Sequence, residues 1–100
     1  MKVINYSLPR SDLASRKLAI IERNKIESYI STKDVLIKLD MANISSISES
    51  YSDELFGVLV LRYGIDTVLN AINVNNAKKH VLLSIAQVMN RRSQELAVAV

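Results

Sequence analysis

Cysteine is absent from this 100-residue chain, and only two glycines and one histidine are present. Without cysteine the chain forms no disulfide, thiolate metal site or cysteine nucleophile, which suits a reducing compartment such as the cytoplasm. Two glycines are too few for a P-loop or a dinucleotide-binding fingerprint. One histidine without cysteine does not supply the three or four ligands that a zinc site needs. Carboxylates are therefore the one serious source of catalytic or metal chemistry.

Long apolar runs and a strong net charge are also lacking. The apolar run that contains FGVLVL, residues 56–61, is far shorter than the roughly 20 residues that span a bilayer. The opening MKVINYSLPR lacks the apolar core of a signal peptide. A net charge of +3 is compatible with nucleic acid but too small to argue for it. With 49% hydrophobic residues, we expect residues 1–100 to form one cytoplasmic domain without membrane contact.

Apolar stretches typical of strands alternate with helical patterns. Strands are expected at residues 2–6, 35–39 and 67–74, and helices at 12–29, 51–63 and from 75–76 to about 92 or beyond. Ser11 is the expected N-cap of the first helix, and Gly64 ends the second. The tail ELAVAV extends the last helix, forms an edge strand or frays. The βαβαβα order predicts a small α/β domain with a mainly parallel sheet and packed helices.

The helix expected over residues 51–63 is apolar nearly all round. One arc holds Leu55, Phe56, Val58 and Leu59. Val60 and Leu61 add apolar surface on the other side, beside Asp53 and Glu54. Such a helix is either deeply buried or covered by a partner. The second alternative makes Val60 and Leu61 an association surface for another protein or for a second copy of the chain.

Acidic residues offer one alternative chemistry. Asp40 lies at the carboxyl end of a predicted strand, where ligands of open α/β sheets gather. Asp53 and Glu54 begin the following helix, and the three acids together would suit Mg²⁺ or a phosphoacceptor pocket of the receiver-domain kind. Receiver domains carry an acidic pair after the first strand, where this chain has Ser7-Leu8-Pro9. The competing interpretation is that Asp53 and Glu54 interact favourably with the helix N-terminus.

Nucleic-acid binding is an alternative function, but the arrangement of the basic residues argues against it. They occur as the isolated pairs Arg16-Lys17, Lys78-Lys79 and Arg91-Arg92, typical of solvated helix faces. No aromatic residues alternate with them, and helix-turn-helix spacing is missing. His80 has no sequence-near Asp or Cys, so we expect an exposed surface histidine.

Three segments resemble the STAS-like family of small prokaryotic domains of unknown function, relatives of the anti-sigma-factor antagonists. They are SRKLA (Ser15–Ala19), VLIKLDMANISSISESYSDELFGVL (Val35–Leu59) and AINVN (Ala71–Asn75). The resemblance implies a STAS-like fold with a switch loop between a central strand and the next helix. It also implies a non-enzymatic regulatory role without metal or cofactor, exercised by binding a partner protein through residues 45–61.

Antagonists of this kind bind an anti-sigma factor, a histidine-kinase-type ATPase that phosphorylates a serine at the start of that helix and so ends the binding. Counting forward from Asp40 matches this serine to Ser50, whereas counting back from Gly57 matches it to Glu54. Ser50 is thus a possible phosphosite, or an N-cap, since Ser50-Tyr-Ser-Asp53 has capping-box spacing. The predicted interaction surface comprises Ser48, Ser50, Asp53, Glu54, Val60 and Leu61.

Overall fold

The computed structural model of the chain describes residues 1–9, 11–32 and 34–98. Along the chain the elements are β1 (Lys2–Ser7), β2 (Asp12–Leu13), α1 (Arg16–Ile30), β3 (Val35–Asp40), β4 (Ser46–Ile47), α2 (Glu49–Ser52), the π-helical η1 (Asp53–Gly57), α3 (Val58–Tyr63), α4 (Ile65–Ala71), β5 (Ile72–Asn75) and α5 (Lys79–Val98). No helix in these ranges is long and apolar enough to cross a membrane.

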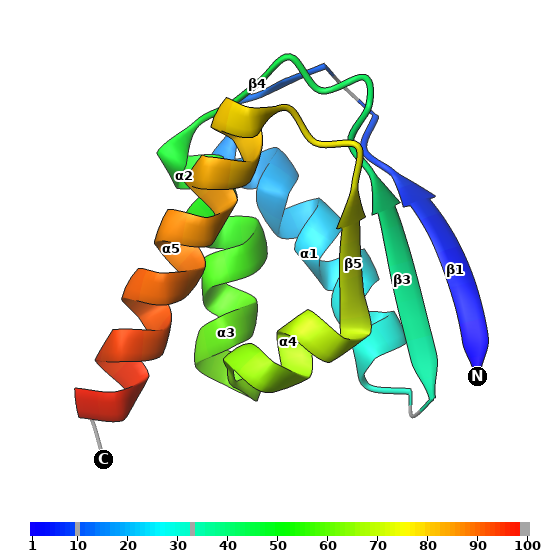
Figure 1. Cartoon of the computed structure of the whole chain (residues 1–100), viewed down its shortest axis with the longest axis vertical. Helices are drawn as coiled ribbons and strands as arrows, with labels where there is room; N and C mark the ends of the chain where they lie inside the picture. Colours follow the sequence, from blue (N-terminus) through cyan, green and yellow to red (C-terminus); the bar gives the residue numbers. More distant parts are fainter. Residues whose placement is uncertain (10, 33, 99–100) are drawn as a thin grey trace.

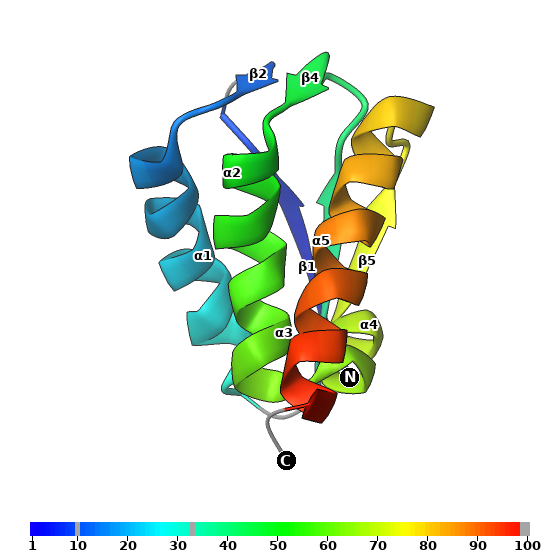
Figure 2. The same cartoon turned by 90° about the vertical axis from the view of Figure 1, so that its left-hand side faces the viewer.

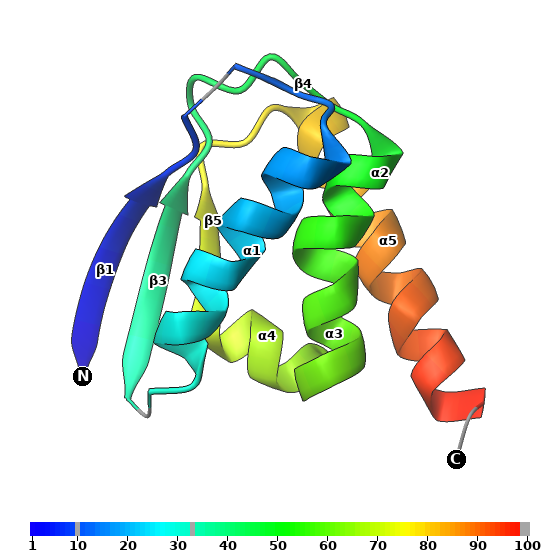
Figure 3. The same cartoon turned by 180° about the vertical axis from the view of Figure 1, so that it is seen from behind.

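A parallel sheet of β1, β3 and β5 forms one layer, with β3 in the middle. Ile4 lies opposite Ile37, which lies opposite Ile72, so the three strands turn a row of apolar side chains to the same face. Figures 1 and 3 show from two sides that the long helices cover this face. The small α/β fold with a mainly parallel sheet and packed helices is therefore confirmed.

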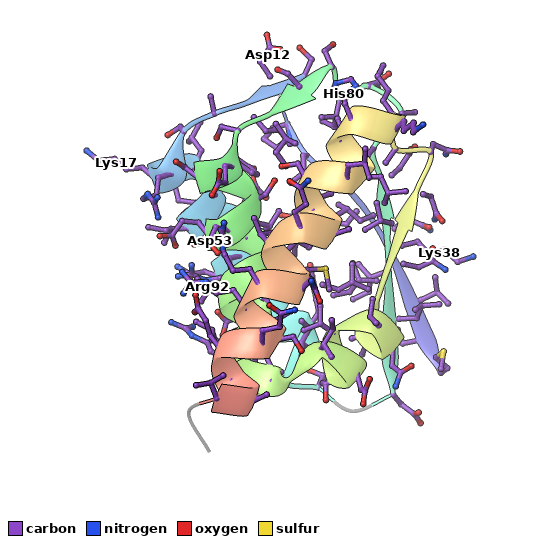
Figure 4. The ribbon with its side chains drawn as sticks, turned by 60° about the vertical axis from the view of Figure 1, so that its left-hand side comes forward. Asp12, Lys17, Lys38, Asp53, His80 and Arg92 are labelled. Atoms are coloured by element: carbon purple, nitrogen blue, oxygen red, sulfur yellow. The ribbon has the colours of Figure 1, made fainter. Side chains whose placement is uncertain are left out.

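The other face of the sheet is exposed and mostly polar. It presents Val3, Asn5, Lys38, Asp40 and Asn73, all of them exposed. Figure 4 shows Lys38 pointing away from the helices. At the carboxyl end of the sheet, β2 and β4 form a separate two-stranded parallel ladder that joins the loops after β1 and β3.

One continuous helical stretch, the central helix, is formed by α2, η1 and α3 over residues 49–63. Figure 2 shows it between α1 and α5, with the sheet behind. Leu55, Phe56, Leu59 and Val60 are 0% exposed. This central position explains why the helix is apolar on nearly every side. The prediction that Val60 lies on an outer surface is wrong, because its neighbours within the chain cover it, while Leu61 is only partly buried.

The strand expected at residues 67–74 is half helix. Ile65–Ala71 form α4, and the strand is confined to Ile72–Asn75. Gly64 separates α3 from α4 with φ of 86°, a conformation that glycine adopts without strain. Within α4 only Val68 is buried, so the β-branched pair Thr67-Val68 does not form the apolar strand that its composition suggested.

Helix starts also differ from the expectation. Ser15, rather than Ser11, caps α1 by accepting a hydrogen bond from the Leu18 N–H at 3.3 Å. The last helix begins at Lys79 because Asn76 has φ of 62°, outside the right-handed helical region. Of the three alternatives for the tail, the helical one holds as far as Val98, and residues 99 and 100 lie outside the described residues.

Candidate functional site on the central helix

The DELFG segment, Asp53–Gly57, is a single π-helical turn inside the central helix. Such turns occur frequently at functional sites because they re-aim side chains relative to the flanking α-helix. Leu55 and Phe56 point into the core and are fully buried. Asp53 and Glu54 instead reach to opposite neighbours, α5 and α1. The segment is therefore a junction between the three long helical elements.

Asp53 binds Arg92 of α5 through both carboxylate oxygens. Arg92 donates from Nε to Oδ1 at 2.8 Å and from Nη2 to Oδ2 at 2.7 Å. Figure 4 shows the two side chains next to each other between the central helix and α5. The Arg92 hydrogen bonds hold the pKa of the Asp53 carboxyl below its usual range. Asp53 is therefore a structural anion, ionised at neutral pH.

Gly57 makes room for this bridge. A Cβ atom at residue 57 would lie 2.3 Å from Oδ1 of Asp53 and 3.1 Å from Cγ of Arg92. The first distance is far inside van der Waals contact, so a side chain at this position would displace the carboxylate. Close packing against the Asp53–Arg92 bridge thus explains why residue 57, one helical turn after Asp53, is a glycine.

Glu54 makes the matching bridge to α1. Arg16 donates to Oε1 at 2.6 Å, and Arg23 donates to Oε2 at 2.7 Å and to the Glu54 carbonyl at 2.8 Å. Hydrogen bonds from Arg16, and then from Arg23, lower the pKa of Glu54. The two adjacent acids therefore tie the central helix to both flanking helices. Any role of Asp53 and Glu54 in binding a partner has to act through these bridges.

The exposed end of the central helix holds the two predicted serines. Ser48 is the N-cap: its Oγ accepts a hydrogen bond from the Tyr51 N–H at 3.0 Å. Ser50 is not the cap, which corrects the capping-box interpretation. The helix starts two residues earlier than expected, so Ser50 is the second helical residue and stays partly exposed.

Ser50 lines a shallow depression of about 180 Å³, the Ser50 depression, whose other walls are Arg16, Glu49, Asp53 and Arg91. Arg16 comes from α1 and Arg91 from α5, and their side chains are 54% and 47% exposed. Arg91 donates to Glu49 at 2.8 Å. The depression is thus a polar, solvent-accessible place where all three helical elements meet.

The acids do not assemble into a metal site. Asp40 accepts from the Ala42 N–H at 3.0 Å and from Nδ2 of Asn76 at 3.2 Å, and these bonds lower the pKa of its carboxyl. Asp53 and Glu54 are bound to arginines instead of to a shared ion. Across residues 1–9, 11–32 and 34–98, no group of three or more His, Cys, Asp or Glu side chains is placed to hold a metal. The proposed cluster of Asp40, Asp53 and Glu54 is therefore not formed.

Three arginines that the sequence did not identify as partners of Asp53 and Glu54 complete the site. Arg16 and Arg92 belong to basic pairs that had suggested solvated surface, and Arg23 is 7% exposed inside the helix layer. Their carboxylate partners are 31 to 39 positions away along the chain, so no local motif reveals the pairing. His80 is exposed as predicted, and its Nε2 lies 2.7 Å from the Ser45 carbonyl, which helps to fix the loop before β4.

A comparison with family models matches residues 23–82 to a STAS-like domain of unknown function. The match includes the DELFG turn and the strand β5, and begins after Ser15–Ala19. No curated protein and no solved structure gives a significant match to the chain.

Proposed function

The chain belongs to the family of STAS-like domains of unknown function, and on that basis we propose that it is a non-enzymatic regulatory protein-interaction module. Its partner binds the face of the molecule around the Ser50 depression. The partner class is an ATPase of the histidine-kinase type that acts as an anti-sigma factor. This class follows from the family resemblance, which supports a partner protein over nucleic acid or a small substrate.

The accessible Ser50 hydroxyl between Arg16 and Arg91 is the observation that carries the proposal. Ser50 is in the first turn of the central helix, where the positive end of the helix dipole favours added negative charge. Arg16 and Arg91 flank it from two different helices. A change of charge on Ser50 therefore alters the electrostatic interactions of three helical elements at a single face of the molecule.

Phosphorylation of Ser50 would act through these arginines. In the step catalysed by the partner, the Ser50 oxygen forms a bond to the γ-phosphorus of ATP as the bond to the leaving group ADP breaks, and the hydroxyl proton is released. The phosphate adds a charge of about −1.5 to −2. Charge-assisted hydrogen bonds then draw Arg16 from Glu54 and Arg91 from Glu49. The face that the partner contacted changes in both charge and shape, and the partner dissociates.

Site-specific photocross-linking tests the proposed face. A benzophenone amino acid is placed at Glu49, in the wall of the Ser50 depression, or at Lys38, on the uncovered face of the sheet. Both positions are exposed. We expect a histidine-kinase-type ATPase from the native host to be captured from position 49 and not from position 38. Equal capture from both positions, or recovery of nucleic acid alone, would contradict the proposal.

Purified ATPase then tests the switch. With ATP, the wild-type chain should become phosphorylated at Ser50 and be released. The Ser50→Ala variant should bind and stay bound, whereas Ser46→Ala, an exposed serine outside the depression, should behave like wild type. Release of the Ser50→Ala variant by ATP would remove Ser50 from the mechanism.

A further inference from the structure

A second cavity, of about 250 Å³, lies between β2, the first half of α1 and Tyr51 of the central helix. Leu13 and Leu18 form apolar parts of its wall. The side-chain polar groups that line it belong to Asp12, Ser15, Glu22 and Tyr51. All four are oxygen groups, and within residues 1–9, 11–32 and 34–98 no lining side chain carries nitrogen. The cavity is therefore suited to a ligand that donates hydrogen bonds and carries positive charge.

Glu22 is the buried charged group of this cavity, whereas Asp12 is exposed. Glu22 is 6% exposed, although carboxylates are costly to bury without a partner. Its Oε2 accepts a hydrogen bond from the Tyr6 hydroxyl. Its Oε1 has Lys25 Nζ at 3.7 Å, beyond hydrogen-bond distance, and no hydrogen-bond donor among the described residues. Oε1 of Glu22 is thus an accessible carboxylate oxygen, within ion-pair distance of Lys25 but free to accept a hydrogen bond from a ligand.

The Tyr51 hydroxyl adds a second oxygen without a hydrogen-bond partner among the described residues, and it is accessible although the residue as a whole is buried. The residue is 2% exposed, and its hydroxyl makes no hydrogen bond with any residue that the structure describes. Burial, and then the charge of Glu22, raise the pKa of Tyr51 to about 12. The phenol therefore stays protonated at neutral pH and accepts a hydrogen bond through its oxygen.

We propose that this cavity binds a small alkylammonium ion. The ammonium group donates to Oε1 of Glu22 and to the hydroxyl of Tyr51, and the alkyl chain packs on Leu13 and Leu18. The volume is below the roughly 300–1,000 Å³ of pockets for drug-sized ligands, so the ligand has few non-hydrogen atoms. This site does not depend on the partner face proposed above, because the two cavities share none of their described lining residues.

Titration of the isotopically labelled full chain with n-butylammonium, followed by NMR, tests the proposal. The neutral control ligand is n-butanol, which has a similar size and shape. We expect shifts at Leu13 and Leu18, and binding of the cation at least about tenfold tighter than that of the alcohol. If the alcohol binds as tightly as the cation, the proposal is wrong.

Substitutions test whether the tighter binding of the cation than of the alcohol depends on Glu22. Glu22→Gln should weaken n-butylammonium about 10- to 100-fold and leave n-butanol unchanged. Glu27→Gln is the matched control on the same helix, since Glu27 binds Arg62 and Tyr63 and does not line the cavity. It should leave both affinities unchanged. An undiminished affinity of Glu22→Gln for the cation would overturn the proposal.

Two further arms complete the test. Should Glu22→Gln fail to fold, Tyr51→Phe keeps the ring in the core and is expected to weaken the cation about threefold or more. Its failure to do so would overturn the role of the hydroxyl. A blocked lysine, Nα-acetyl-lysine methylamide, distinguishes the sources of the ligand. Tighter binding than n-butylammonium, lost in the same variants, would assign the alkylammonium group to a lysine side chain of a polypeptide.

Discussion

Substitution of Gly57 by alanine should destabilise the chain, although the same change usually stabilises a helix. The new Cβ would lie 2.3 Å from Oδ1 of Asp53, so the carboxylate has to leave its bidentate contact with Arg92. Breaking a fully buried ion pair costs about 3–5 kcal/mol. The Asp53 and Arg92 side chains are 12% and 27% exposed, which lowers that cost. Against it stands a gain of about 1 kcal/mol in helix propensity.

We therefore expect Gly57→Ala to lower the free energy of unfolding by about 1–2 kcal/mol, measured by urea denaturation. In an Asp53→Ala background the obstructing carboxylate is gone, and Gly57→Ala should become neutral or stabilising by up to about 1 kcal/mol. The matched control is Gly64→Ala, which has open space but φ of 86°. Its cost of about 1–3 kcal/mol should be the same in both backgrounds, because φ of 86° with ψ of 153° is a conformation essentially restricted to glycine. Additive effects of Gly57→Ala and Asp53→Ala would refute the account of the DELFG turn.

The other predictions concern the same helix. Arg92 lowers the folded-state pKa of Asp53, so the ionised Asp53 carboxylate stabilises the fold above its unfolded-state pKa of about 3.9, and this stabilisation is lost as the pH falls through the folded-state pKa. The melting temperature of Asp53→Asn should therefore fall less steeply with decreasing pH than that of the wild type. Ser48→Ala should cost about 1 kcal/mol in urea denaturation as the loss of an N-cap, and Ser50→Ala less than about 0.5 kcal/mol; the reverse order would restore Ser50 as the cap. Val60→Asp should prevent folding, measured by circular dichroism, because the Val60 side chain is fully buried. Leu61→Arg should fold, because Leu61 is partly exposed. Size-exclusion chromatography of Leu61→Arg should show the loss of any dimer that uses Leu61.

Periodicity and composition predicted the layers of the fold but not all of its elements. The apolar strand VLIKL at 35–39 and the helix ended by Gly64 are strong local signals, and the structure has both. The segment at 67–74 misled because Thr67 and Val68 favour strands, while Val68 is the one buried residue of α4. Seven residues of helix, Ile65–Ala71, precede the edge strand that begins at Ile72.

The site was predictable in its location and not in its chemistry. The DELFG block could be recognised from the sequence as the conspicuous feature. The ion-pair partners of its two acids could not be recognised, because Arg92 lies 39 positions after Asp53 and Arg23 lies 31 positions before Glu54. The same three-dimensional pairing explains why the acids do not form a metal site. It also leaves Ser50 as the predicted contact residue that is accessible beside two partly exposed arginines.

The central claim is tested most directly with the ATPase that cross-linking identifies. Its affinity is measured for the chain with phosphoserine incorporated at residue 50. Isothermal titration compares this protein with the unmodified chain and with a chain carrying phosphoserine at residue 46. We predict that phosphoserine at 50 weakens binding at least about tenfold, while phosphoserine at 46 has a much smaller effect. Equal affinity of the unmodified and Ser50-phosphorylated chains would contradict the account.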